Sequence, residues 1–304
     1  SMPKPAKVGR GQRVLDSAGA ATAARTGLLE INELAIAYPR PSGGLNEVVR
    51  GVDLSIARGQ IVGLVGESGS GKSQTAFASL GVLPNEAVIT RGSIRFDGRE
   101  LVGLTDAQMR QLRGKEIAYI PQEPMSNLDP SYKVGAQLVE GVRSALGVTR
   151  AEASSQVLAL LERVGIADPK RTFDSYPHQI SGGMAQRVLI AGAVASRPKL
   201  LIADEPTTAL DVTVQAEILD LLRDLQSELD MAILLVTHNF GVVADLCDRI
   251  AVMQNGVIVE SGTAAEVFSH PTHEYTKMLL GAILDESTVR TDPPVAASDE
   301  RTDR

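Results

Sequence analysis

The chain of 304 residues is 43% apolar and 22% charged, a balance that suits a globular fold with an ample core. Its net charge of −7 argues against a general nucleic-acid binder, and no run approaches the ~20 apolar residues that a bilayer-spanning helix needs. The single cysteine, Cys247, excludes an internal disulfide and a zinc or iron–sulfur site built from cysteines.

The two ends of the chain differ in composition from the segment between them. Residues 1–27 are rich in Ala, Gly and Arg without clear periodicity, and we predict a disordered leader, with a transit peptide as the alternative. Residues 284–304 are polar and interrupted by proline, which predicts a disordered tail. The fold is therefore expected between these ends.

Short apolar runs typical of strands recur along that segment. Asp97-Gly98 and Asn255-Gly256 are dipeptides typical of tight hairpin turns. The predicted strands are residues 28–38, 47–56, 62–65, 92–98, 116–120, 199–204, 232–237 and 249–261.

Amphipathic segments with recognisable helix caps lie between these runs. Thr149 with Glu152, and Thr263 with Glu266, match the capping-box pattern, and Asp211 can cap a further helix. Residues 123–197 carry few strand signals and are predicted to be helical. Strands that alternate with helices predict an α/β sheet, to which the early hairpins add a small antiparallel part.

The stretch GESGSGKS, residues 66–73, fits the P-loop pattern G-x-x-x-x-G-K-[ST] between a predicted strand and a predicted helix. A glycine-rich turn there exposes successive backbone N–H groups and points a helix N-terminus at the same place, which favours a bound phosphate. A chance glycine-rich loop is the alternative, but the flanking elements argue against it. The predicted phosphate-binding residues are Gly66, Glu67, Ser68, Gly69, Ser70, Gly71, Lys72, Ser73 and Gln74.

Two side chains of this loop have their own predicted roles. Lys72 would reach the β- and γ-phosphates, and the Ser73 hydroxyl would bind Mg²⁺. Downstream, Asp204 and Glu205 end the apolar run KLLIAD, where a carboxylate suits Mg²⁺ through a water molecule. Glu205 would face the other way along an extended chain and polarise a water for attack on the γ-phosphorus. An Asp-Glu pair at a strand end can also be purely structural.

Gln122 and His238 follow two other predicted strands. The amide of Gln122 could contact Mg²⁺ or the attacking water, or lie on the surface without a role. An imidazole at His238 could hold the γ-phosphate and Glu205 in position, although a single histidine at a strand end is more often structural.

Ser181, in QISGGMAQR, can cap a helix whose first turn holds Gly182 and Gly183. The cap and the two glycines make a second helix N-terminus suited to phosphate.

The motifs GESGSGKS, IPQEP, ISGGMAQR, LLIADEP, TALD and VTHN, in this order, resemble an ABC transporter ATPase subunit over roughly residues 28–283. GKSQTAF, EPMSNLDPSYKVGAQL and HPTHEYTKMLL resemble the oligopeptide/dipeptide importer branch. The resemblance implies a P-loop NTPase fold of the ABC-ATPase type, with a RecA-like core, an antiparallel β subdomain and a helical subdomain at about residues 123–197. It divides the chain into an ATPase domain, residues 28–270, and a C-terminal peptide-importer motif, residues 271–283.

The resemblance also implies site roles in a dimer that clamps two ATP molecules. Gln122 would sense Mg²⁺ and the permease, Glu205 would be the general base, and Tyr38 would stack on adenine unless it is only an interface residue. The residues that would contact the ATP of the second subunit are Ser181, Gly182, Gly183, Gln186 and Asp211. Ile180 and Asn239 depart from the family's usual Leu and Asp.

As a whole, the resemblance implies an ATP- and Mg²⁺-dependent ATPase that powers peptide import from the cytoplasmic face of the plasma membrane. Its implied partners are two permease subunits, a second ATPase subunit and an extracytoplasmic substrate-binding protein, with no nucleic acid. Three alternatives stay open: nickel, glutathione or another small solute as cargo, a non-catalytic nucleotide-binding subunit, and a soluble ABC ATPase acting on nucleic acid or ribosomes.

Overall fold

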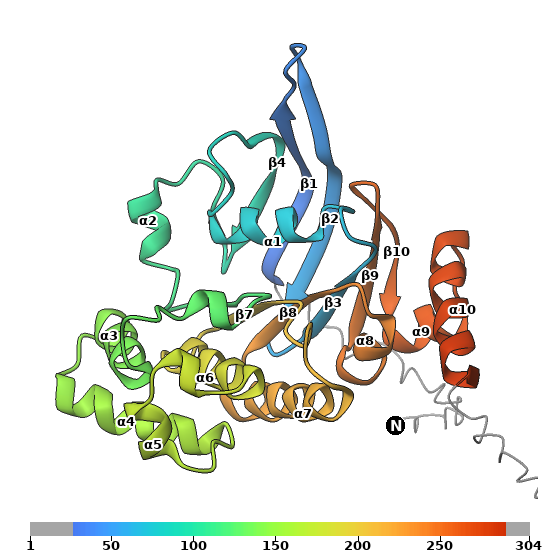
Figure 1. Ribbon diagram of the computed structural model, residues 1–304. Helices are drawn as coiled ribbons and strands as arrows, with labels where there is room; N and C mark the ends of the chain where they lie inside the picture. Colours follow the sequence, from blue (N-terminus) through green and yellow to red (C-terminus); the bar gives the residue numbers. More distant parts are fainter. Residues whose placement is uncertain (1–26, 290–304) are drawn as a thin grey trace, which may run out of the picture.

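A six-stranded sheet forms the centre of the molecule (Figure 1). The computed structural model describes residues 27–289. The strand order is β10-β9-β3-β8-β7-β6, parallel except for the antiparallel pair β9–β10. The strands are β3 Ile61–Val65, β6 Ile117–Ile120, β7 Leu200–Asp204, β8 Ala232–Thr237, β9 Arg249–Gln254 and β10 Val257–Thr263.

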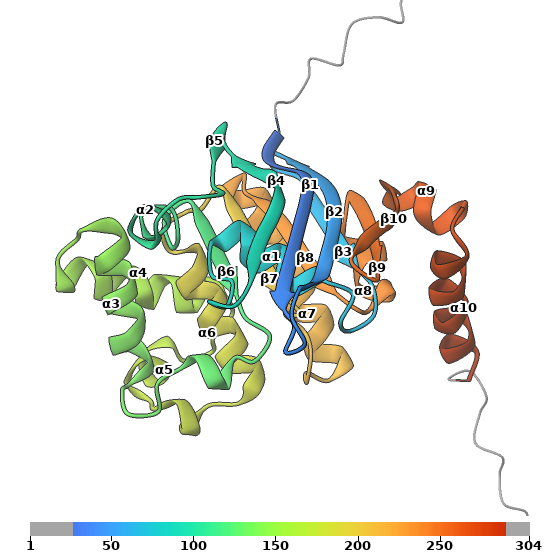
Figure 2. The same cartoon turned by 90° about the horizontal axis from the view of Figure 1, so that it is seen from above.

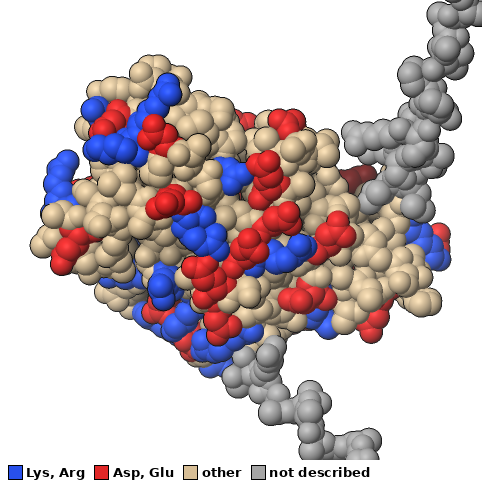
Figure 3. Space-filling model, turned by 90° about the horizontal axis from the view of Figure 1, so that it is seen from below, with Lys and Arg blue, Asp and Glu red and all other residues tan. Residues whose placement is uncertain are grey.

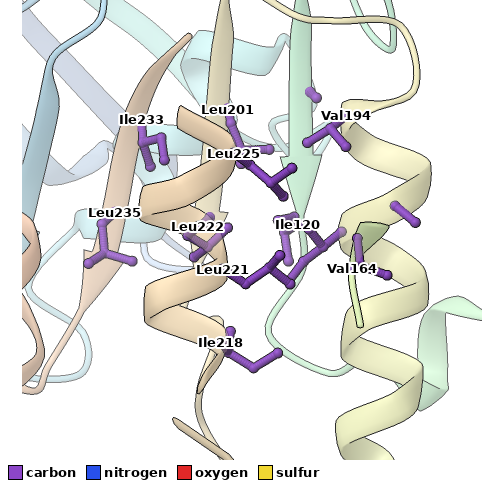
Figure 4. Packing of buried hydrophobic residues seen from close by; sticks show 14 of the residues in the cluster. Ile120, Val164, Val194, Leu201, Ile218, Leu221, Leu222, Leu225, Ile233 and Leu235 are labelled. Carbon is purple, nitrogen blue, oxygen red and sulfur yellow. The ribbon is translucent and has the colours of Figure 1, made fainter. Parts of the chain in front are cut away.

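The parallel strands are apolar throughout because both faces of the sheet are covered. In β7, Leu201 packs into one hydrophobic cluster and Leu200 and Ile202 into the other. Helix α7, Val212–Leu229, covers the first face with its leucine-rich side, where Leu221, Leu222 and Leu225 approach Leu201 and Ile120 (Figure 4).

A second, four-stranded antiparallel sheet covers the other face, with helix α1, Lys72–Leu80, between the two sheets (Figures 1 and 2). Its strand order is β2-β1-β4-β5: β1 Gly27–Pro39, β2 Leu45–Ala57, β4 Val88–Phe96 and β5 Arg99–Glu100. Both predicted hairpin turns are confirmed, because Asp97-Gly98 joins β4 to β5 and Asn255-Gly256 joins β9 to β10. The first residue of each turn has φ 49 and the second φ 81, as such tight turns require.

The chain between β6 and β7, all of it described by the structure, forms only helices, as predicted. These are η1 Met125–Asn127, α3 Val134–Leu146, α4 Arg150–Arg163, α5 Pro169–Asp174, η2 Pro177–Gln179 and α6 Gly182–Val194. Helices α3 to α5 lie at one side of the molecule, opposite the C-terminal helices α9, Ala264–Ser269, and α10, Glu274–Val289 (Figure 2).

The predicted helix caps are confirmed. The side chains of Thr149 and Thr263 accept hydrogen bonds from the backbone N–H groups of Glu152 and Glu266, respectively. Each glutamate carboxylate in turn accepts a hydrogen bond from the backbone N–H of its threonine. Asp211 accepts from Val214 N at 3.0 Å at the start of α7. Three helices were not predicted. Helices α2 Asp106–Arg110 and α8 Phe240–Leu246 are too short to show a period, and α10 falls in residues that the sequence analysis assigned only to a C-terminal motif and a disordered tail.

The fold is the predicted one: a P-loop core sheet, an antiparallel β sheet and an inserted group of helices. At the ends, β1 begins at Gly27 and α10 continues to Val289, past the start of the predicted tail at residue 284. The rest of that tail and the predicted leader, residues 1–26, lie outside the described residues. Within residues 27–289 no helix is both long and apolar enough to cross a membrane.

Candidate functional site

A cleft of about 580 Å³ opens where the P-loop meets the carboxyl ends of the parallel strands. It brings together Tyr38, Gln122, Glu205 and His238, which come from separate parts of the chain. Its lining is Tyr38, Val48, Glu67, Ser68, Gly69, Gly71, Lys72, Ser73, Gln74, Gln122, Glu205 and His238. The other predicted residues of this group, Gly66, Ser70 and Asp204, are buried beside it.

The P-loop takes its path because two of its glycines touch neighbouring backbone. A Cβ on Gly66 would lie 2.1 Å from the carbonyl oxygen of Met253, a distance too short for any side chain. Gly71 caps α1 with φ 104, and a Cβ there would meet the Val48 carbonyl at 2.9 Å. The N-terminus of α1 therefore opens directly into the cleft, where it favours an anion.

Lys72 is almost buried, and its ammonium group is held by the loop itself. Its Nζ donates to the carbonyl oxygens of Gly66 at 2.7 Å and Glu67 at 2.8 Å. Burial lowers the pKa of Lys72, while the nearby carboxylates of Glu205 and Asp204 act against that shift. Lys72 therefore lies at the P-loop, and among residues 27–289 no carboxylate forms an ion pair with it.

Asp204 lies at the end of β7 under the cleft, 3% exposed, with Ser73 Oγ donating to its Oδ1 at 3.4 Å. Burial raises the pKa of Asp204, and the Glu205 carboxylate adds to the rise. Sequence reasoning missed Tyr119 of β6, whose pKa is raised to about 12 by burial and by the charge of Asp204. A tyrosine within the otherwise aliphatic run IAYI, residues 117–120, was the available signal.

Replacing Asp204 by Asn should raise the melting temperature of the nucleotide-free protein by about 2–6 °C. The folded-state pKa of Asp204 lies above its ordinary value of 3.8, so its contribution to stability is present below that value and is lost as the pH rises through the folded pKa. The uncharged amide does not suffer this loss. Calorimetry in EDTA should show the largest difference between variant and wild type at neutral pH and a smaller one in acid. Asp220→Asn, at an exposed carboxylate paired with Arg223, is the control; equal effects of the two changes would contradict the prediction.

Glu205 does not follow the extended geometry that the sequence argument assumed. Its φ is 48, and its backbone N–H donates to the Val236 carbonyl at 2.7 Å. The alternation of side chains along a strand therefore does not explain its direction, and that part of the prediction is wrong. This left-handed conformation, costly for a residue with a side chain, turns the carboxylate toward the end of β8.

The Glu205 carboxylate is oriented by the residues that end β8. Thr237 Oγ1 donates at 3.0 Å, and His238 contributes its backbone N–H at 2.8 Å and its Nδ1 at 2.7 Å. His238 remains mostly exposed to the cleft, with a side-chain exposure of 60%. A carboxylate at the cleft wall, held by an imidazole that itself faces the cleft, suits the activation of a water molecule.

The five residues predicted to act on a second subunit do not line this cleft. Ser181 caps α6 through Met184 N at 3.2 Å, and Ser181, Gly182 and Asp211 are exposed. Gln186 differs from them, because its side chain is 1% exposed and its Nε2 donates to the Pro206 carbonyl at 2.7 Å. In this structure Gln186 ties α6 to the segment after Glu205 and is not presented outward.

Residues 49–208, which include the P-loop, the inserted helices and β7, match the family model described as ABC transporter. The chain belongs to the ABC transporter family. It binds and hydrolyses ATP, and the predicted resemblance to this family is confirmed.

The sequence similarity of this ABC transporter ATPase to known proteins extends beyond residues 49–208. It is 47% identical to the oligopeptide transport ATP-binding protein OppD of Bacillus subtilis, over 85% of this chain and 72% of that protein. It is 44% identical to the dipeptide transport ATP-binding protein DppD of Haemophilus influenzae, over 84% and 77%. A solved dimer of the ATP-binding cassette MJ0796, in a post-hydrolysis state bound to ADP and Pi, matches with a TM-score of 0.69 at 26% identity, over 78% of this chain and 98% of that one.

Proposed function

We propose that this ABC transporter ATPase powers the import of di- or oligopeptides across the plasma membrane. The observation that carries the hydrolytic part is the cleft in which the P-loop lysine faces a glutamate oriented by a histidine. The peptide cargo is supported by the relatives at 44–47% identity, which are named as oligopeptide and dipeptide transport proteins. Nickel, glutathione or another small solute is the alternative cargo.

In this proposal the triphosphate lies along the P-loop. Lys72 moves from the carbonyls of Gly66 and Glu67 to the β- and γ-phosphates, and the N-terminus of α1 stabilises their charge. Tyr38, whose hydroxyl donates to Gln74 Oε1 at 2.5 Å, stacks on the adenine. Glu205 takes a proton from the attacking water, while His238 holds the carboxylate in place.

The residues around Ser73 fit a magnesium ion. The Ser73 hydroxyl, the Asp204 carboxylate and the Gln122 amide offer oxygen donors, which Mg²⁺ prefers, and the raised pKa of Asp204 shows a buried acid that a cation would stabilise in its charged form. Ser73 and Gln122 would hold the ion directly and Asp204 through a water. The ion would neutralise charge on the β- and γ-phosphates.

In this proposal a second ATPase subunit completes the ATP-binding site of the first. Ser181 and Gly182, both exposed, and the half-buried Gly183 form a helix N-terminus outside the cleft, which fits a phosphate held by another copy or a paralogue. Asp211, exposed at the start of α7, contacts the partner at the same interface. Gln186 supports this surface from within.

The proposed subunit lies on the cytoplasmic side of the membrane, where it binds the membrane-embedded part of the importer. Two permease subunits contact the helices around residues 123–139, and an extracytoplasmic protein delivers the peptide. On the face shown in Figure 3, acidic and basic side chains are interspersed, which gives no support to the alternative of a nucleic-acid-dependent ATPase.

Purification from native membranes followed by reconstitution tests this proposal. We expect co-purification with two integral membrane permeases, and ATP turnover that rises when a peptide-loaded binding protein is added to the vesicles. Stimulation of ATP turnover by nickel or glutathione but not by peptides would show that the transported solute is not a di- or oligopeptide. Co-purification with nucleic acid and no permease would overturn the proposal.

A further inference from the structure

One peptide unit of the P-loop is held at both of its ends. The carbonyl of Gly66 accepts from Lys72 Nζ at 2.7 Å, and the N–H of the same peptide, that of Glu67, donates to the Tyr275 hydroxyl at 2.9 Å. Because a peptide unit is planar, the direction of its N–H fixes the direction of its carbonyl. Tyr275 therefore sets the orientation of a group that holds the phosphate-binding lysine.

Tyr275 reaches the loop from the far end of the chain, 208 residues away. It is 5% exposed, does not line the cleft, and belongs to the apolar cluster that contains Phe240, Val243 and Val252. The Glu67 N–H is thus directed toward Tyr275 of the C-terminal helix α10, which lies outside the cleft. Its role in this structure is to fix the loop rather than to bind the ligand.

The segment that carries Tyr275, residues 272–276, is itself anchored to the core sheet, and we name it the C-terminal brace. Glu260 of β10 accepts from Thr272 N at 2.8 Å, Thr272 Oγ1 at 3.0 Å and His273 N at 3.1 Å. On the other side of the loop, Gly256 N in the β9–β10 turn donates to the Ser70 carbonyl at 2.9 Å. The same hairpin therefore supports the loop directly through Gly256 and indirectly through the brace.

We propose that the C-terminal brace sets the affinity of this chain for the phosphates of ATP, with Tyr275 as the positioning residue. The inference rests on the proposed binding of ATP at the P-loop. Without the hydroxyl, the Glu67 N–H loses its partner, and the Gly66–Glu67 peptide can rotate out of its binding orientation. A smaller fraction of molecules then has the loop in its binding conformation. The apparent dissociation constant for ATP rises in inverse proportion to that fraction.

The test compares Tyr275→Phe with wild type in the full chain. Calorimetric titration with magnesium-ATP should give about three- to tenfold weaker binding for the variant, while adenosine, which has no phosphate, should bind equally well to both. In turnover assays KM should rise by a similar factor, with kcat changed less. A purely structural role would lower thermal stability and leave the affinity for ATP unchanged.

A second pair of variants tests the anchor. Glu260→Gln weakens the three bonds that hold the brace and should lower the affinity for magnesium-ATP in the same way. Glu274→Gln, on the same segment but with an exposed carboxylate paired with Lys277, is the matched control and should bind like wild type. If wild type binds magnesium-ATP and Tyr275→Phe and Glu260→Gln bind it equally tightly, the role of the brace is refuted and the proposed function stands. If wild type itself does not bind, the proposed function fails.

Discussion

Glu205→Gln is expected to bind magnesium-ATP at least as tightly as wild type and to hydrolyse it about 10²- to 10⁴-fold more slowly. Gln keeps the size of the side chain, and its oxygen can still accept from the backbone N–H and the Nδ1 of His238, which lie 2.8 and 2.7 Å from Glu205 Oε1. What it cannot do is accept a proton from water. The change also removes a negative charge from the wall of the cleft, which favours the bound triphosphate.

Binding and turnover must be measured separately to establish this. Titration with ATP reports affinity, and phosphate release from the reconstituted transporter reports the rate. Glu228→Gln makes the same chemical change at an exposed position on α7, where Glu228 pairs with Arg163, and should leave both quantities at wild-type values. Turnover retained by Glu205→Gln would show that another group is the base.

The parts of the site that sequence reasoning found are those that depend on local pattern or on strand direction. The P-loop is contiguous, so its glycines and Lys72 could be placed from spacing alone. Gln122, Asp204 and His238 come at or just beyond the carboxyl ends of β6, β7 and β8, which are parallel neighbours and so share one edge of the sheet. The topology that the α/β pattern predicts was enough to bring them together.

The parts that were missed depend on backbone angles and on contacts between distant segments. The direction of Glu205 comes from its φ of 48, for which the sequence ADEP gives no signal. The burial of Gln186 against Pro206 depends on how α6 packs on the sheet. The bond between Glu67 and Tyr275 joins residues 208 positions apart, and periodicity carries no information on such a pair.

A substitution at Gly182 separates the two halves of the proposed ATP site. A Cβ on Gly182 would meet no atom within 4 Å, and this first residue of α6 does not have a positive φ. Nothing within the described residues of this chain therefore requires glycine there. An aspartate at a helix N-terminus is also favourable to the helix, so Gly182→Asp should fold and bind ATP at its own P-loop as wild type does.

The expected loss lies in assembly and turnover. In the dimer, the new carboxylate would stand where the helix tip meets the phosphate of the partner's ATP, so like charges would be forced together. We expect ATP-dependent dimerisation to disappear and ATP turnover to fall about 100-fold or more, the size of effect seen when hydrogen-bond donors to a reacting group are removed.

Light scattering in magnesium-ATP, with Glu205→Gln blocking hydrolysis and the natural partner ATPase supplied, measures the assembly. Gly141→Asp, at an exposed helical glycine whose Cβ would likewise meet nothing within 4 Å, should dimerise normally. If Gly182→Asp dimerised and hydrolysed ATP like this control, a negative charge would be tolerated at the N-terminus of α6. That result would show that this helix end does not bind the phosphates of the partner's ATP.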